Sequence, residues 1–81
     1  MRLVSQHGNV DIPYDKAVLL HAQGDVMAIV GDKEYILGVY SSMEKSYRVM
    51  EMVREEYLET VYDYRTRPKV FKFPKDEEVE V

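Results

Sequence analysis

The sequence predicts an α+β fold, in which a curled antiparallel meander of about five strands packs on one long helix. Short apolar runs rich in β-branched residues, separated by turns that contain glycine, fill the first half of the chain. Apolar residues then recur every three or four positions over residues 43–61, which is the period of an amphipathic helix. A short alternating run over residues 70–73 predicts one further strand near the C-terminal end.

The strands are delimited by their turn residues. His7-Gly8-Asn9, Gln23-Gly24 and Gly31-Asp32-Lys33 are clusters typical of turns between antiparallel strands. Pro13 ends the second strand and cannot donate to a ladder, so we expect this strand at a sheet edge. The expected strands are Met1–Ser5, Val10–Ile12, Ala17–Ala22, Asp25–Val30 and Glu34–Tyr40.

The third, fourth and fifth strands are apolar on both faces, whereas a sheet with one wet face alternates apolar and polar residues. The helix can cover one face only. The other face is covered by the N-terminal hairpin, by the C-terminal strand or by another copy of the chain. We expect a curled sheet and self-association. The alternative is a small sheet that closes into a half-barrel around its own core.

The helix is expected from Ser42 to Val61, with Ser41 and Glu44 as a capping box at its start. One face is apolar and the opposite face is charged, so the apolar face should lie on the sheet. The expected apolar stripe is Met43, Tyr47, Met50, Val53, Tyr57 and Val61, and the charged residues are Glu44, Lys45, Arg48, Glu51, Glu55 and Glu59.

Four residues are candidates for a protein interface. Val49 and Met52 lie off the expected stripe and predict a small exposed patch on the helix. Phe71 and Phe73, in the last strand, are expected as interface anchors or as core residues.

Length and composition predict a single domain over residues 1–81, with residues 76–81 as an acidic tail. A chain of 81 residues is marginally stable alone, and it has no cysteine with which to form disulfides. A homo-oligomer, with a dimer favoured, would supply the missing burial. No apolar run is long enough to span a membrane and no signal peptide is visible, so we expect a cytoplasmic protein.

No pattern of catalytic or ligand-binding residues is present. His7 and His21 match no metal-ligand spacing, and the four glycines are scattered singly rather than grouped in a phosphate-binding loop. We therefore predict no enzyme activity, no cofactor and no metal.

Nucleic-acid binding is the alternative function. Residues 62–75 carry five Lys or Arg and one Asp, interleaved with aromatic residues, as in stacking platforms for single strands. The overall net charge of −4 and the acidic tail argue against it. The candidate contacts are Tyr64, Arg65, Arg67, Lys69 and Lys72.

Several segments together resemble small uncharacterised proteins of Firmicutes bacteria, their phages and prophages. The segments are Ser5–Gly8, Val10–Tyr14, Leu37–Lys45, Val49–Met52 and Phe71–Val81. The resemblance covers most of the chain and implies a bacterial host, but it carries no activity and no catalytic residues. We expect an interaction or assembly module of phage or prophage type that binds itself or a protein partner in the host cytoplasm.

Overall fold

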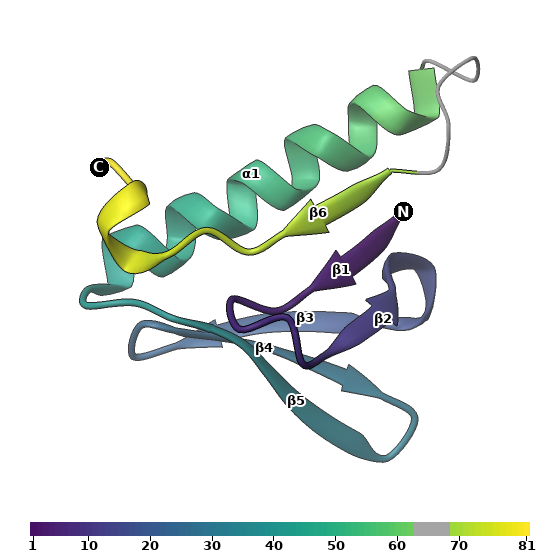
Figure 1. Cartoon of the computed structure of the whole chain (residues 1–81), viewed down its shortest axis with the longest axis horizontal. Coiled ribbons are helices and arrows are strands. Elements are labelled where there is room, and N and C mark those ends of the chain that lie inside the picture. The colour runs from purple at the N-terminus through teal and green to yellow at the C-terminus, as the bar shows by residue number, and fades with distance from the viewer. Residues whose placement is uncertain (63–68) are drawn as a thin grey trace.

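The computed structural model describes residues 1–62 and 69–81, and these form one helix and two small sheets around a shared core (Figure 1). The α+β class, the long helix and the C-terminal strand are confirmed. The elements are β1 (Arg2–Val4), β2 (Asp11–Pro13), β3 (Val18–Ala22), β4 (Asp25–Val30), β5 (Lys33–Val39), α1 (Met43–Tyr62) and β6 (Val70–Lys72). Short 3₁₀ turns occupy Tyr14–Lys16 and Asp76–Glu78.

The prediction of one five-stranded meander was wrong. Strands β3, β4 and β5 form a meander, but β1 and β2 form a second sheet with β6, in the order β2-β1-β6. Strand β6 pairs parallel with β1, and hydrogen bonds from Arg2 N to Lys69 O and from Phe73 N to Val4 O extend this pairing. Local sequence patterns predict strands but not distant pairing partners, because pairing depends on the tertiary path of the chain.

The turn between β3 and β4 is a tight two-residue hairpin. Gln23 and Gly24 both have positive φ, of 53° and 90°, which is the backbone of a type I′ turn. A Cβ on Gly24 would clash with the carbonyl group of Tyr40, whose N–H donates to Gly24 O at 2.9 Å. Glycine is therefore required here by both the turn and the close approach of Tyr40.

Gln6 joins the two sheets. Its backbone N–H donates to Leu37 O at 2.8 Å, and its side-chain oxygen accepts from Val39 N at 2.9 Å. The side-chain nitrogen donates to Val39 O at 3.3 Å and to Pro74 O at 3.0 Å. One glutamine thus satisfies backbone groups of β5 and of the segment after β6.

The helix begins one residue later than the predicted capping box requires. Ser42, not Ser41, caps α1, since its Oγ accepts from Lys45 N at 3.2 Å. The backbone N–H of Ser41 instead donates to a carboxylate oxygen of Asp76 at 2.9 Å. Ser41 therefore fixes the C-terminal segment rather than the helix start.

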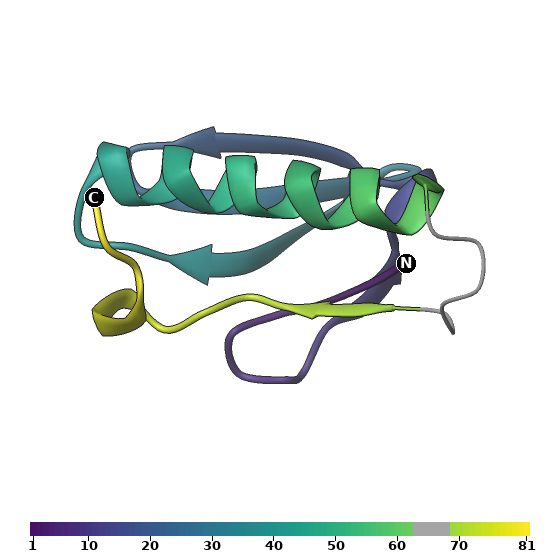
Figure 2. The same ribbon diagram turned by 90° about the horizontal axis from the view of Figure 1, so that it is seen from above.

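The helix is also rotated relative to the predicted stripe. Its buried face is centred on Ser46, Val49 and Val53, whereas Met43 and Tyr47 are 61% and 56% exposed. The helix packs against β3 and β4, and β6 runs along its other flank (Figure 2). Next to β6, Lys69 Nζ bonds to Glu56 and Glu59 of the helix. Both sheets contribute side chains to the core next to this helix, and the buried arc of α1 is displaced from the apolar stripe and includes a serine.

Candidate interaction surface

The outer face of the β3–β5 sheet is apolar and faces away from α1. Strand registers place its side chains in three cross-strand rows: Val18–Ile29–Glu34, Leu20–Met27–Ile36 and Ala22–Asp25–Val39. Only Asp25 and Glu34 are charged, and the middle row is wholly apolar. We call this surface the outer face. Val18, Ile36 and Val39 are 63%, 55% and 54% exposed, and Leu20, Met27 and Ile29 are partly exposed.

The inner face of the same sheet explains why the outer face is free. Val26, Ala28 and Leu37 point inward and are almost completely buried in the core with Val49 and Val53 of α1. Successive side chains on a strand point to opposite faces, so their neighbours must point outward. The helix therefore covers one apolar face and leaves the other exposed.

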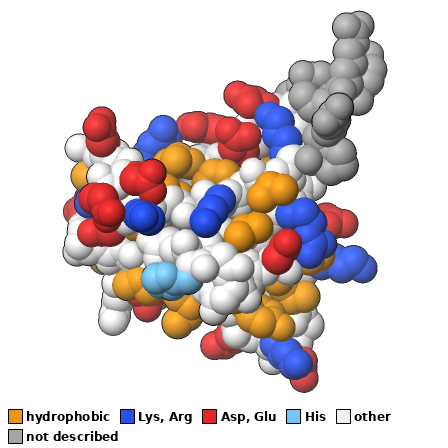
Figure 3. Space-filling model, in the orientation of Figure 1, with side chains coloured by type: hydrophobic (Ala, Val, Ile, Leu, Met, Phe, Trp, Pro, Cys, Tyr) orange, Lys and Arg blue, Asp and Glu red, His pale blue; other side chains and the backbone are white. Residues whose placement is uncertain are grey.

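The second sheet lacks such a surface. Its outward side chains include Arg2, Asp11 and Lys72, and Arg2 Nε donates to Asp11 Oδ1 at 2.8 Å. In Figure 3, hydrophobic side chains reach the surface over the lower part of the molecule, where β4 and β5 lie. Large apolar patches on soluble proteins commonly mark interaction sites.

A second apolar surface lies on the flank of α1 beside β3. Met43, Tyr47 and Leu58 are 61%, 56% and 46% exposed. Tyr47 lies edge-on to the His21 ring of β3, with the ring centroids 6.0 Å apart. We call these three exposed residues the helix flank. None of the three belongs to the buried core or packs against it as a partly buried residue.

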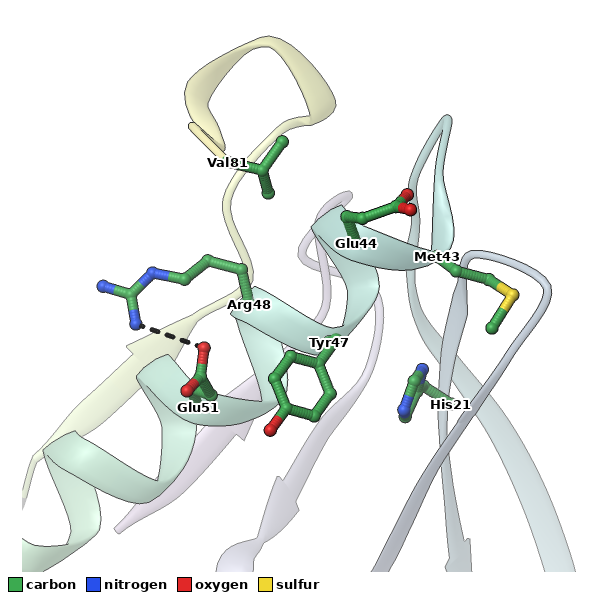
Figure 4. Close-up of a pocket in the computed structure, with 7 residues that line it drawn as sticks. All are labelled: His21, Met43, Glu44, Tyr47, Arg48, Glu51 and Val81. Atoms are coloured by element: carbon green, nitrogen blue, oxygen red, sulfur yellow. Dashed lines mark ion pairs between the residues drawn. The ribbon is translucent and has the colours of Figure 1, made fainter.

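An open groove of about 440 Å³ runs over the start of the helix flank (Figure 4). Met43, Tyr47 and His21 form one side of it, and Arg48 and Glu51 lie on the other side as an ion pair of 3.8 Å. The remaining lining residues are Glu44 and Val81. The groove is mostly apolar, and its lining residues bring together no convergent set of catalytic groups.

His21 is held by the buried hydroxyl of Ser46. Ser46 Oγ donates to Met43 O at 2.9 Å and lies 3.1 Å from Nδ1 of His21, within hydrogen-bond distance. Ser46 has no exposed surface. This serine–histidine pair therefore supports packing and cannot act as a nucleophile on a substrate.

The predicted patch of Val49 and Met52 does not form. Val49 is completely buried and Met52 is half-buried against the core. Phe71 and Phe73 are also core residues, 8% and 1% exposed, and pack edge to face with centroids 5.1 Å apart. The parallel pairing of β6 with β1 places these rings inside, so they are not available as surface anchors. The exposed apolar face instead lies on the strands that the sequence shows as apolar on both faces.

The predicted nucleic-acid contacts are only partly described. Tyr64, Arg65 and Arg67 lie outside the described residues, and Lys72 is exposed on β6. Lys69 Nζ bonds to Glu59 at 3.2 Å and to Glu56 at 3.5 Å, and the bond to Glu59 is the main cause of its raised pKa. These two acids neutralise the Lys69 charge, and the alternative function stays a prediction from sequence.

Residues 1–62 and 69–81 contain no group of three potential metal ligands. In the same part of the chain, no helix is both long and apolar enough to cross a membrane. No protein-family model matches the chain, and no curated protein or solved structure has significant similarity to it. The surfaces themselves are therefore the basis for a functional proposal.

Proposed function

We propose that this chain is a non-catalytic assembly module that self-associates by packing its outer face against the outer face of a second copy. The observation that supports it is the middle row of that face, Leu20–Met27–Ile36, which carries no charge in an exposed three-stranded sheet. Two such sheets stack about 10 Å apart, with their side chains interdigitated, as in a β-sandwich.

The arrangement of charges supports a symmetric pairing. Glu34 occupies a corner of the outer face, and Asp25 lies in the row nearest the β3–β4 turn. A twofold axis near Met27 would bury the apolar centres of both copies and keep both carboxylates at the rim. Closed twofold pairing of identical patches is the most common form of protein self-association.

The expected strength of this pairing is modest. Burying a half-exposed aliphatic side chain contributes about 1 kcal/mol at roughly 25 cal/mol per Å². Summed over both copies, this gain is comparable to the association cost of about 4–15 kcal/mol. We therefore expect a reversible, concentration-dependent dimer. The phage or prophage context that the resemblance implies is part of the same proposal, while the assembly role rests on the outer face alone.

Light scattering over a concentration series tests the proposal with two matched variants. Ile36→Lys places a charge in the centre of the outer face and should weaken the dimer at least tenfold. Val70→Lys is the control, because Val70 is 63% exposed on the other sheet, and it should leave the mass unchanged. Both side chains are exposed, so neither change should unfold the chain.

A wild-type chain that is monomeric at high micromolar concentration would contradict the proposal. Equal dissociation by Ile36→Lys and Val70→Lys would also contradict it, because the effect would then not be specific to the outer face.

A further inference from the structure

The edge of β3 is the one strand edge in residues 1–62 and 69–81 that carries none of the usual protection. Edge strands usually avoid further pairing by being short or by carrying charges, proline or a bulge. Strand β2 is three residues long and ends in Pro13, and β6 is three residues long and carries Lys72. The Gln6 side chain bonds both Val39 N and Val39 O at the edge of β5. Strand β3 is the uncharged and regular run VLLHA.

The hairpin turn determines which backbone groups of β3 face outward. In a two-residue hairpin the flanking residues, here Ala22 and Asp25, form a hydrogen-bonded pair. Val18, Leu20 and Ala22 therefore bond to β4, while the N–H and C=O groups of Leu19 and His21 point away from it. No hydrogen bond from the described residues reaches these outward groups.

We propose that β3 pairs antiparallel with β3 of a second copy, about a twofold axis at Leu20. This register places Leu19 opposite the partner's His21, so that each such pair exchanges both of its outward hydrogen bonds. It places Val18 opposite the partner's Ala22 and Leu20 opposite the partner's Leu20. The result is one continuous six-stranded sheet, with α1 of both copies on its inner side.

The helix flank fits this pairing. Helix α1 packs over both β3 and β4, and a helix axis midway between two strands would lie about half a strand spacing inside β3. With strands about 4.8 Å apart, the two helices would lie about 9–10 Å apart, which is the usual distance for packed helices. The helix flank would then be buried between the helices instead of lying in water.

The position of the twofold axis along α1 determines which helix residues of the two copies would meet. His21 bonds to Ser46, and Leu19 lines the same cavity as Met50 and Arg54, so Leu20 lies beside the middle of α1. Antiparallel packing about that point brings Met43 near the partner's Leu58 and Tyr47 near the partner's Arg54. The first contact is apolar, and the second is favourable between a guanidinium group and an aromatic ring.

This inference rests on the proposed self-association but assigns it a second interface. Pairing at the β3 edge leaves the outer face exposed, so packing of two six-stranded sheets through that face would close a tetramer. The two interfaces use different residues, so each can be removed separately.

Charged residues placed at the two ends of β3 test the register of the proposed β3–β3 pairing. The double variant Val18→Lys/Ala22→Lys places like charges opposite each other at both ends of the paired strands. The double variant Val18→Glu/Ala22→Lys places opposite charges there. Both put two charges on the outer face, so outer-face packing is impaired in both. Sedimentation should show the like-charged variant about tenfold weaker in dimer formation than the oppositely charged one.

A disulfide test gives a second measurement, because the chain has no cysteine. Leu20→Cys should form a linked dimer on mild oxidation, because Leu20 meets its own copy at the axis. Ala22→Cys should not, because it lies opposite the partner's Val18.

The outcomes separate the two proposals. Two results would overturn β3 pairing and leave outer-face packing in place. One is a wild type that associates while the two charge variants have equal masses. The other is a disulfide-linked dimer of Ala22→Cys but not of Leu20→Cys. A monomeric wild type would overturn the proposed function as well.

Discussion

Asp76 is the residue that fixes the C-terminal segment to the start of the helix. Its carboxylate accepts from the backbone N–H of Ser41 at 2.9 Å and from Ser41 Oγ at 3.1 Å, and Lys45 Nζ lies 3.4 Å away. The backbone hydrogen bond from Ser41 is the largest cause that lowers the pKa of Asp76, followed by the Ser41 hydroxyl and the charge of Lys45. The segment described as an acidic tail in the sequence is thus partly bound, with Val79 in the core.

A lowered pKa in the folded state means that folding favours the charged form of Asp76. Its contribution to stability is complete above the ordinary aspartate pKa, and it is lost as the pH falls through that value toward the lower folded one. Asp76→Ala should therefore lower the melting temperature at neutral pH, and the difference from wild type should shrink in acid. The control Glu77→Ala, at an exposed neighbouring position, should have little effect at either pH. A pH-independent difference for Asp76→Ala would contradict this reasoning.

At the scale of the element, the helix shows how far periodicity can be trusted. Spacing predicted the bounds of α1 closely, because a 3.6-residue period is a local property of the chain. It did not predict the rotation of α1. Ser46 lies at the centre of the buried face, and a polar residue there makes that face less apolar than the flank. Two hydrogen bonds satisfy Ser46 inside, which a hydrophobic pattern cannot indicate.

The rotation of the helix predicts a contrast between two truncations. Val49→Ala removes methyl groups from a completely buried site and should lower the free energy of unfolding by about 2 kcal/mol. Met43→Ala, at an exposed position, should change it by less than about 0.5 kcal/mol. Urea titration in dilute solution, where association does not contribute, measures both. The opposite order would mean that the sequence-based stripe is the buried one.

The strand pairings likewise divide into those that the sequence could predict and one that it could not. The hairpins β3–β4 and β4–β5 could be predicted, because Gln23-Gly24 and Gly31-Asp32 are strong turn signals between nearby partners. The pairing of β6 with β1 could not, since about 68 residues separate their partners and no local rule specifies such a contact. The sequence left Phe71 and Phe73 open between interface anchors and core residues for this reason, because their burial depends on that pairing.

At the scale of the whole molecule, Gln6 is the polar link that holds the two sheets together. It bonds to Leu37, Val39 and Pro74 across sequence separations that range over most of the chain. Gln6→Glu should be more damaging than Gln6→Ala. The carboxylate would face the carbonyl oxygens of Val39 and Pro74 without a proton to donate, whereas alanine only removes the bonds.

We expect Gln6→Ala to lower the free energy of unfolding by about 1–3 kcal/mol and Gln6→Glu by more. Amide hydrogen exchange gives the local test, since Val39 N–H should lose protection in Gln6→Ala, which has no side-chain oxygen to accept from it. Retained protection of Val39 would show that a different contact joins the sheets.

The sequence could predict that an exposed apolar face exists, but it could not predict which residues form it. Two-sided apolar strands correctly indicated a face that the helix cannot cover, and the structure shows that face as the rows of β3, β4 and β5. Which residues compose it depends on the strand registers and on a bulge between Val26 and Met27. The sequence therefore indicated that an exposed apolar face exists, while the fold determines where it lies.

The parallel pairing of β1 with β6 also has a consequence for how the protein is made. A ribosome releases residues 2–4 well before residues 70–72, yet each strand needs the other to complete its sheet. Phe71, Phe73 and Val79, which complete the core, also emerge after α1 and the β3–β5 sheet. The nascent chain therefore cannot close this core until residues 71–79 have left the ribosome. A product that is terminated before these residues would expose the incomplete core to cellular proteases.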